Sequence, residues 1–165
     1  METIYIGFSR PKGWFEPFSW LIRLCQWTSY SHVYIRIYSE SINRDIIYQA
    51  SGLAVNYIGL EKFKSKEIII KEFPIEISTE TKIKMLQYCV DNAGAPYSSL
   101  EILGIGWILL NSLFNRKVGN PFSDGKRSFI CSEFVGEALK EIGYNISDPE
   151  RLDPKEVYQF LSKMS

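Results

Sequence analysis

The stretch that decides the fold of this chain reads Ser31-His32-Val33-Tyr34-Ile35-Arg36-Ile37-Tyr38. Its aliphatic residues alternate with polar and aromatic ones, which is the pattern of a β-strand with one buried face. The aliphatic residues then point into the core, and His32 lies on the opposite face with Tyr34 and Arg36. His32 is the only histidine among the 165 residues, so any chemistry that needs an imidazole must use it.

Strand patterns dominate the first half of the chain, and helix patterns dominate the second. Further strands are expected at residues 3–8, 45–50, 53–58 and around 68–70, where the last one ends near Pro74. Helices are expected at residues 16–28, 78–92, 98–114 and 129–142, with a short last helix that opens at Asp153-Pro154. This order favours an α+β fold in which helices cover an antiparallel sheet or partial barrel, as one domain of residues 1–165.

The composition narrows the classes of protein that fit. Nineteen basic residues balance nineteen acidic ones, which argues against a nucleic-acid binder. Three widely spaced cysteines suit neither a disulfide framework nor a zinc site. The N-terminus lacks the features of a signal peptide, so a cytoplasmic location is expected. The apolar run 100–114 is shorter than the roughly 20 residues of a membrane span, so a buried or partner-facing helix is favoured over membrane contact.

A candidate nucleophile stands at the start of the helix expected at 129–142. Cys131 lies in its first turn, with Ser128 as the expected N-cap. The positive end of the helix dipole favours a thiolate there, and the backbone N–H of Cys131 is free to donate to an oxyanion. The competing interpretation is that Cys131 is a small buried apolar residue, which is the usual place of a free cysteine.

A base also needs a partner that orients its second ring nitrogen. If residues 31–38 pair with residues 45–50 in a hairpin, one register places Gln49 beside His32 and the other places Tyr48 there. The amide oxygen of Gln49 is able to accept a hydrogen bond from the imidazole. Gln49 fits equally well as a solvent-facing strand residue.

Five short segments, in this order, resemble the permuted NlpC/P60 papain-like superfamily, and within it the YiiX/YebB-like group, which is related to lecithin:retinol acyltransferase-like proteins. They are the opening strand 4–10, the helix and strand segments 20–23 and 28–33, the strand segment 48–52, the Gly-x-x-Tyr segment 93–97 and the nucleophile helix segment 131–135.

The resemblance implies a circularly permuted papain-like fold with Cys131 as nucleophile and His32 as general base. The third member of the group is often a Glu, and here Gln49 stands at that position. Tyr30 and Tyr34 flank the base and would shape the substrate cleft, although packing within the sheet is an equally good role for them.

The expected activity is thioester-mediated hydrolysis of an amide or ester in a short peptide, a cell-wall peptide or a lipid, with no metal or cofactor. The alternatives are a binding module that has lost turnover and an acyltransferase that works at a membrane surface.

Overall fold

The structure, a computed structural model, describes the chain except for residues 14–16, 53, 97–129, 150–151 and 165. The helix expected at 98–114 and the loop after it lie outside the described residues, as does Ser128. Within the described part, no helix is both long enough and apolar enough to cross a membrane.

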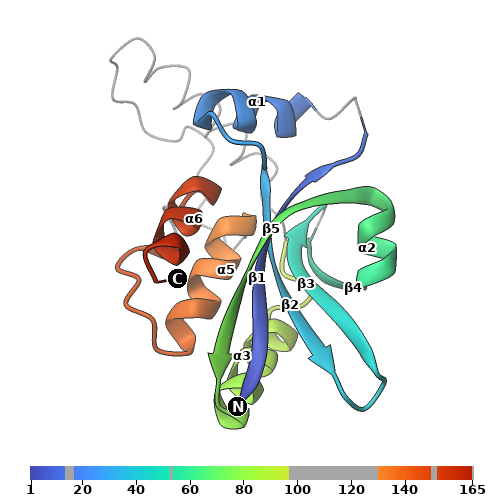
Figure 1. The fold of residues 1–165 in the computed structure, drawn as a ribbon, viewed down its shortest axis with the longest axis vertical. Helices are drawn as coiled ribbons and strands as arrows, with labels where there is room; N and C mark the ends of the chain where they lie inside the picture. Colours follow the sequence, from blue (N-terminus) through green and yellow to red (C-terminus); the bar gives the residue numbers. More distant parts are fainter. Residues whose placement is uncertain (14–16, 53, 97–129, 150–151, 165) are drawn as a thin grey trace.

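A five-stranded antiparallel sheet forms the centre of the molecule, and it stays open and does not close into a barrel (Figure 1). Its order is β4-β3-β2-β1-β5. The strands are β1 (Glu2–Pro11), β2 (His32–Ser39), β3 (Arg44–Ser51), β4 (Ala54–Gly59) and β5 (Glu67–Ile77). The expected α+β class and the antiparallel sheet are therefore confirmed.

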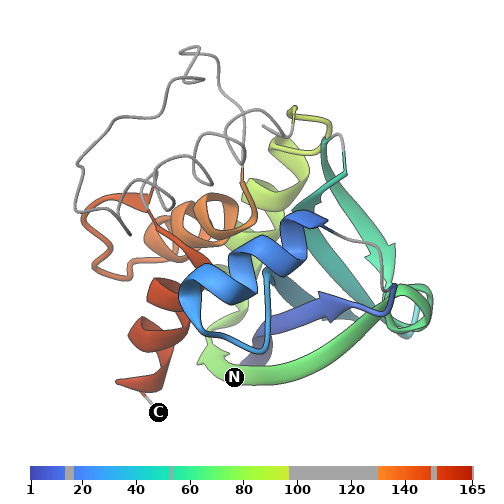
Figure 2. The ribbon, with the colours of Figure 1, turned by 90° about the horizontal axis from the view of Figure 1, so that it is seen from above.

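Helices cover both faces of this sheet. They are α1 (Pro17–Gln26), α2 (Leu60–Lys66), α3 (Thr79–Asp91), α5 (Cys131–Glu141) and α6 (Pro154–Ser162). Figures 1 and 2 show α5 and α6 on one side of the sheet and α2 on the other. The last helix begins as expected, because Asp153 caps it by accepting a hydrogen bond from the Glu156 N–H at 2.7 Å.

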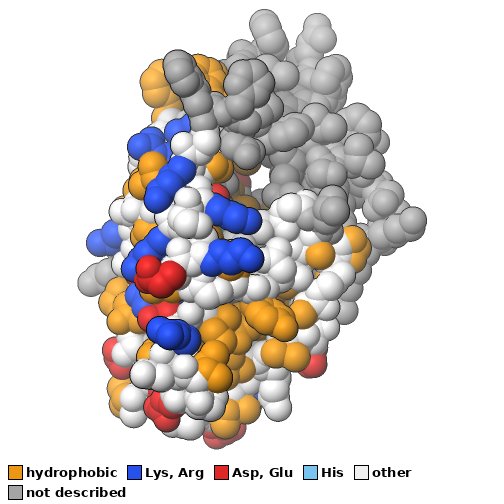
Figure 3. Space-filling view, turned by 90° about the vertical axis from the view of Figure 1, so that its right-hand side faces the viewer, with side chains coloured by type: hydrophobic (Ala, Val, Ile, Leu, Met, Phe, Trp, Pro, Cys, Tyr) orange, Lys and Arg blue, Asp and Glu red, His pale blue; other side chains and the backbone are white. Residues whose placement is uncertain are grey.

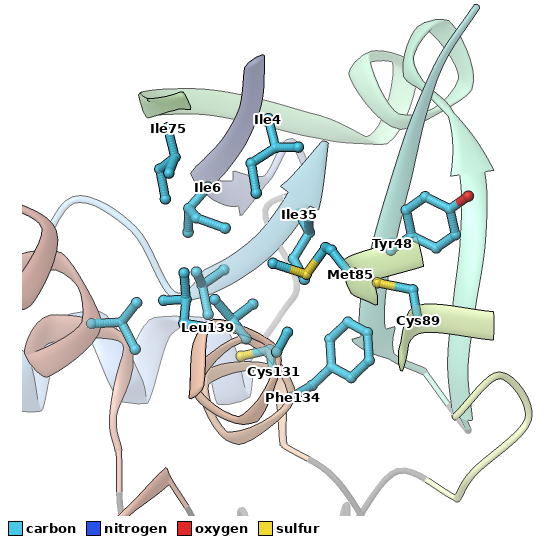
Figure 4. Close-up of a cluster of buried hydrophobic side chains, with 14 of the residues drawn as sticks. Ile4, Ile6, Ile35, Tyr48, Ile75, Met85, Cys89, Cys131, Phe134 and Leu139 are labelled. Atoms are coloured by element: carbon cyan, nitrogen blue, oxygen red, sulfur yellow. The ribbon is translucent and has the colours of Figure 1, made fainter. Parts of the chain in front are cut away.

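The main core lies between the sheet and helices α3, α5 and α6. Val33, Ile35 and Ile37 of β2 are 0%, 0% and 1% exposed, which confirms the predicted core face. The prediction of a single buried face is wrong, because Tyr34 on the other face is also buried. Figure 4 shows side chains of α3 and α5 facing the sheet across this core, among them Met85 and Cys131. The alternation of β2 therefore places the face opposite His32 in contact with the helices.

A smaller core covers the opposite face of the sheet, under α2. It consists of Tyr34, Ile47 and Phe63, all of which are buried. Helix α2 was not predicted from the sequence, because it is only seven residues long and has one buried residue, Phe63. Three lysines of α2 are exposed, and Figure 3, which faces this side of the molecule, shows basic side chains gathered there with acidic ones among them.

Strand β5 differs from its expected length, because it continues past Pro74 to Ile77. Pro74 pairs with Tyr5 of β1, and β5 is an edge strand with no other neighbour in the sheet. A proline costs a sheet little at an edge, since its missing N–H can face away from the neighbouring strand. The proline therefore marks an edge strand here and not the end of a strand.

The other edge of the sheet, β4, is joined by residues 94–96. The Val55 N–H donates to the Ala95 carbonyl at 2.8 Å, and the Gly94 N–H donates to the Val55 carbonyl at 2.9 Å. Pro96 forms an isolated bridge with Ala54. The Gly-x-x-Tyr segment quoted above therefore docks, in its described part, on the hairpin that carries Gln49.

Candidate active site

His32 is the first residue of β2, and Gln49 of β3 is its polar partner. The His32 Nε2 and Gln49 Oε1 atoms are 2.8 Å apart. Strand β3 pairs with β2 so that Tyr48 lies opposite Ile35 on the core face, which leaves Gln49 on the face of His32. The sequence left Gln49 and Tyr48 open as the partner of His32, and the structure shows that Gln49 is beside the ring.

This contact determines which nitrogen of the histidine can act as a base. An amide oxygen only accepts hydrogen bonds, so Nε2 of His32 must carry the proton that it donates to Gln49. In the neutral ring Nδ1 then holds the lone pair. Nδ1 is the atom that can take a proton from a nucleophile.

The hydrogen-bonded chain extends beyond Gln49 to Asn56 of β4. The Nε2 group of Gln49 donates to Asn56 Oδ1 at 3.2 Å. Asn56 Nδ2 donates in turn to the backbone carbonyls of Ser51 and Ala54, at 3.0 and 2.9 Å. Asn56 was not among the site residues predicted from the sequence, and the signal that could have found it is its place opposite Gln49 in the second hairpin.

Cys131 is the first residue of α5 and is 6% exposed. Its thiol lies against the backbone N–H of Val33, the residue that follows His32. The β2–β3 ladder ends at Ile35 and Tyr48, so Val33 lies beyond its end. The thiol is thus placed at the start of β2, where this ladder has stopped, and no hydrogen bond joins it to the His32 ring among the described residues.

Burial raises the pKa of the Cys131 thiol above its ordinary value. The backbone N–H groups of Val33, Ser132 and Cys131 act in the opposite direction by favouring the thiolate, and the Glu67 carboxylate adds to the increase. The backbone donors at the helix N-terminus favour the thiolate, as expected from the sequence, but the net shift of the pKa is upward. The donors are present, but loss of solvent outweighs them.

Burial also changes the state of the base. It lowers the pKa of His32 to about 4, and the hydrogen bond with Gln49 offsets only part of this effect. Gln49 carries no charge, so it holds the ring in place without strongly favouring imidazolium. The resting site near neutral pH therefore contains a neutral thiol and a neutral imidazole, not an ion pair.

A carboxylate, which the sequence analysis also missed, borders the site. Ser9 of β1 pairs with His32 in the sheet, and its buried hydroxyl donates to Glu67 at 2.9 Å. Glu67 is the first residue of β5, and its charge acts on the Cys131 thiol. Nothing in the local sequence around Glu67 indicates this, because β1 separates β5 from β2.

The two tyrosines expected at the cleft are both buried. Tyr30 is 6% exposed and stacks on Tyr158 with ring centroids 5.2 Å apart, and burial raises the pKa of Tyr30 to about 12. Tyr34 is 0% exposed in the smaller core, and its hydroxyl donates to Glu72 at 2.9 Å. These contacts match the packing role that was the alternative for both residues.

Comparisons with known proteins identify the fold. The chain matches no family model and no curated protein sequence. Among solved structures it is similar to the metalloprotein YiiX from Escherichia coli O157:H7, with a TM-score of 0.50 and 20% identity over 95% of this chain and 91% of that one. This likeness shows that the chain has a YiiX-like fold, which confirms the fold expected from the five sequence segments.

Proposed function

We propose that the protein is a cysteine hydrolase of amides or esters, with Cys131 as nucleophile, His32 as general base and Gln49 as the orienting partner. The observation that carries this proposal is the 2.8 Å contact from His32 Nε2 to Gln49, because it leaves Nδ1 as the free base on the strand that borders the thiol. A nucleophile, a base and an orienter in this relation are what thiol catalysis requires.

The first half of the reaction forms a thioester. Nδ1 of His32 takes the thiol proton while Sγ of Cys131 attacks the substrate carbonyl carbon. The backbone N–H of Cys131, at the start of α5, donates to the oxygen that becomes negative. When the carbonyl re-forms, the bond to the amine or alcohol breaks, and the imidazolium returns its proton to that leaving group.

The second half releases the acid. His32 removes a proton from a water molecule that attacks the thioester carbonyl, and the thiol leaves with the proton held by the ring. Gln49 keeps the ring oriented in both halves. The substrate class, an amide or ester of a short peptide, a cell-wall peptide or a lipid, comes from the family resemblance.

The described residues do not supply a metal centre to this mechanism. The similar YiiX structure is that of a metalloprotein. Within the part of this chain that the structure describes, no group of three or more His, Cys, Asp or Glu side chains is placed to hold a metal ion. The described residues of this chain therefore do not fit a metal site, and the mechanism includes no step at a metal.

Acylation by p-nitrophenyl acetate tests the proposal. We expect release of nitrophenolate together with an acetyl adduct on Cys131, detected by peptide mass spectrometry. The adduct should be absent in Cys131→Ala and strongly reduced in His32→Ala, whereas Cys89→Ala serves as the matched control because Cys89 is also a buried thiol. An equal adduct on Cys131 and Cys89, or none on Cys131, would contradict the proposal and favour a binding module of the same fold.

A second candidate, acyl transfer at a membrane surface, is favoured by α1. Trp20, Leu24 and Trp27 are 59%, 55% and 89% exposed, at spacings that place them on one side of the helix and its end. The helix is tied to the start of β2, because the Ser19 and Ser31 hydroxyls are 2.6 Å apart. An exposed apolar stripe thus lies on the helix that is anchored beside the base.

Cosedimentation with phosphatidylcholine vesicles separates this candidate from the first. If transfer at a surface is the function, the wild type should sediment with vesicles and Trp27→Glu should stay in solution. Thr28→Ala, next to it, is the control. If neither protein sediments, the membrane candidate is excluded and hydrolysis in solution remains.

A further inference from the structure

We propose that Asn56 is a positioning residue that sets the tautomer of His32, acting through Gln49. This inference rests on the proposed function, because it assigns a residue to the same site. Its basis is the direction of each hydrogen bond in the chain from β4 to His32. The side chain of Asn56 itself does not contact the ring.

The orientation of the Asn56 amide follows from two backbone carbonyls, which can only accept hydrogen bonds. The carbonyls of Ser51 and Ala54 are 3.0 and 2.9 Å from one end of the Asn56 amide, so that end must be the NH2 group. The reverse orientation would place an amide oxygen against two carbonyl oxygens and lose both hydrogen bonds. The Asn56 oxygen therefore faces Gln49.

The orientation of Asn56 in turn fixes the orientations of Gln49 and His32. The Asn56 oxygen needs a donor, so the NH2 group of Gln49 points toward it at 3.2 Å and the Gln49 oxygen points toward His32. Because that oxygen only accepts, the proton of the neutral ring is held on Nε2. Nδ1, the nitrogen proposed to take the thiol proton, is kept free.

Without Asn56 the Gln49 amide is free to rotate by half a turn. Its NH2 group would then face Nε2, which could only accept, and the ring proton would move to Nδ1. A ring with its proton on Nδ1 has no lone pair there for the proposed proton transfer. Gln49 alone therefore offers two orientations, and Asn56 selects the productive one.

The far end of this series of hydrogen bonds, at Asn56, is fixed by the backbone of the β3–β4 hairpin. Gln49 and Asn56 are direct partners across β3 and β4, and Ser51 pairs with Ala54 at the turn, where Gly52 has a φ of 70°. A left-handed φ suits glycine, so the tight turn that brings the two carbonyls together is accessible. The selecting groups are thus fixed by the fold and not by mobile side chains.

Nuclear magnetic resonance of the 15N-labelled imidazole tests the proposal directly, since the chain has one histidine and the spectrum contains one ring. At pH 7.5 we expect the wild type to carry its proton on Nε2. In Asn56→Ala the ratio of Nε2–H to Nδ1–H should fall by roughly fivefold, the factor that one net hydrogen bond supplies. Tyr57→Ala, an exposed neighbour on β4, should keep the wild-type spectrum.

A rescue variant separates tautomer selection from general damage. Gln49→Glu in the Asn56→Ala background should restore the Nε2–H form, because a carboxylate has no donor end to present to the ring. Asn56→Asp retains the acceptor toward Gln49 and should keep Nε2–H, although it loses the two hydrogen bonds to the Ser51 and Ala54 carbonyls. It therefore tests the acceptor separately from these two hydrogen bonds.

The ring spectrum of a folded Asn56→Ala protein tests the proposal. If that variant does not fold, the ring spectrum of Asn56→Asp tests it. An unchanged Nε2–H ring in the alanine variant, or a Nδ1–H ring in the aspartate variant, would overturn the proposal. The spectrum does not depend on turnover. A wild type that forms no acetyl adduct but shows the expected ring spectra would therefore refute the hydrolase and leave the tautomer assignment standing.

Discussion

The two described free thiols of this protein, Cys131 and Cys89, are both buried in the main core, but they differ in the backbone donors around them. They are 6% and 1% exposed, and burial raises the pKa of each thiol. Cys131 is the first residue of α5 and has three backbone N–H groups that favour its thiolate, whereas Cys89 lies inside α3, where burial alone acts on its thiol. The comparison teaches that donors aimed at a thiol, and not its exposure, distinguish a candidate nucleophile from a packing residue.

The largest expected effect is the loss of the base. In His32→Ala, acylation of Cys131 by p-nitrophenyl acetate should slow by about 100- to 10,000-fold, the range that a general base contributes. The residual labelling of Cys89 should not change, because no base serves that thiol. Nitrophenolate release and peptide mass spectrometry measure both. If the substitution slows the labelling of Cys131 and Cys89 equally, His32 does not act specifically on Cys131.

Alkylation by iodoacetamide sharpens the same contrast without a substrate. We expect Cys131 to react at least about tenfold faster than Cys89 in the folded protein, because hydrogen bonds to a charged group are each worth roughly that factor. The rate at Cys131 should still be rising above pH 8, since burial raises the pKa of this thiol. Unfolding in urea should make the two rates similar. An alkylation rate of Cys131 that does not change with pH from 6 upward would show a preformed thiolate instead.

The partly buried His32 should also make stability depend on pH. The pKa of His32 is about 4 when folded and 6.5 ordinarily, so between these values the unfolded chain binds more protons. The stability contributed by the neutral ring is complete above pH 6.5 and is lost as the pH falls toward 4. The unfolding constant should rise by at most about tenfold per pH unit from this group.

Urea unfolding of the wild type and His32→Gln measures this dependence. Glutamine has no titratable group, so the variant should lose that part of the slope between pH 6.5 and 4. Equal slopes in the two proteins would mean that titration of His32 does not cause this pH dependence.

The smallest effect on activity near neutral pH is expected from Gln49→Glu. A carboxylate still accepts from His32 Nε2, so the ring stays oriented, but its charge raises the pKa of His32 by about 1–3 units. The acid limb of the rate profile should therefore move upward, while the rate at pH 8 changes little. Gln49→Leu, which removes the acceptor, should slow the reaction at every pH. The finding that would count against this role is a Gln49→Leu protein with wild-type rates.

The sequence was sufficient for the parts of the molecule that depend on local pattern. The alternation in β2 predicted which face of the strand packs into the main core, and Asp153 and Pro154 predicted where α6 begins. Both signals depend on spacing within a few residues. The strand boundaries were close for the same reason, except where Pro74 suggested an end that the edge position of β5 removed.

The arrangement of the candidate site could not be predicted from local sequence, because its residues come from separate strands and helices. Whether Gln49 or Tyr48 meets His32 is a matter of strand register, because a shift of one residue exchanges the faces of a strand. Asn56 enters only through a second hairpin. The state of the Cys131 thiol depends on how much of α5 the core covers, and local helix geometry predicted the opposite direction of its pKa shift.

The segment at residues 94–96 has a consequence for self-association. An edge strand offers unpaired backbone groups to which another chain can add a strand. On β4 the N–H and carbonyl of Val55 are both occupied by residues 94 and 95, and Pro96, beside Ala54, has no N–H to offer. The stretch of β4 around Val55, next to Asn56, is therefore covered by the protein's own chain and offers no backbone groups for strand addition.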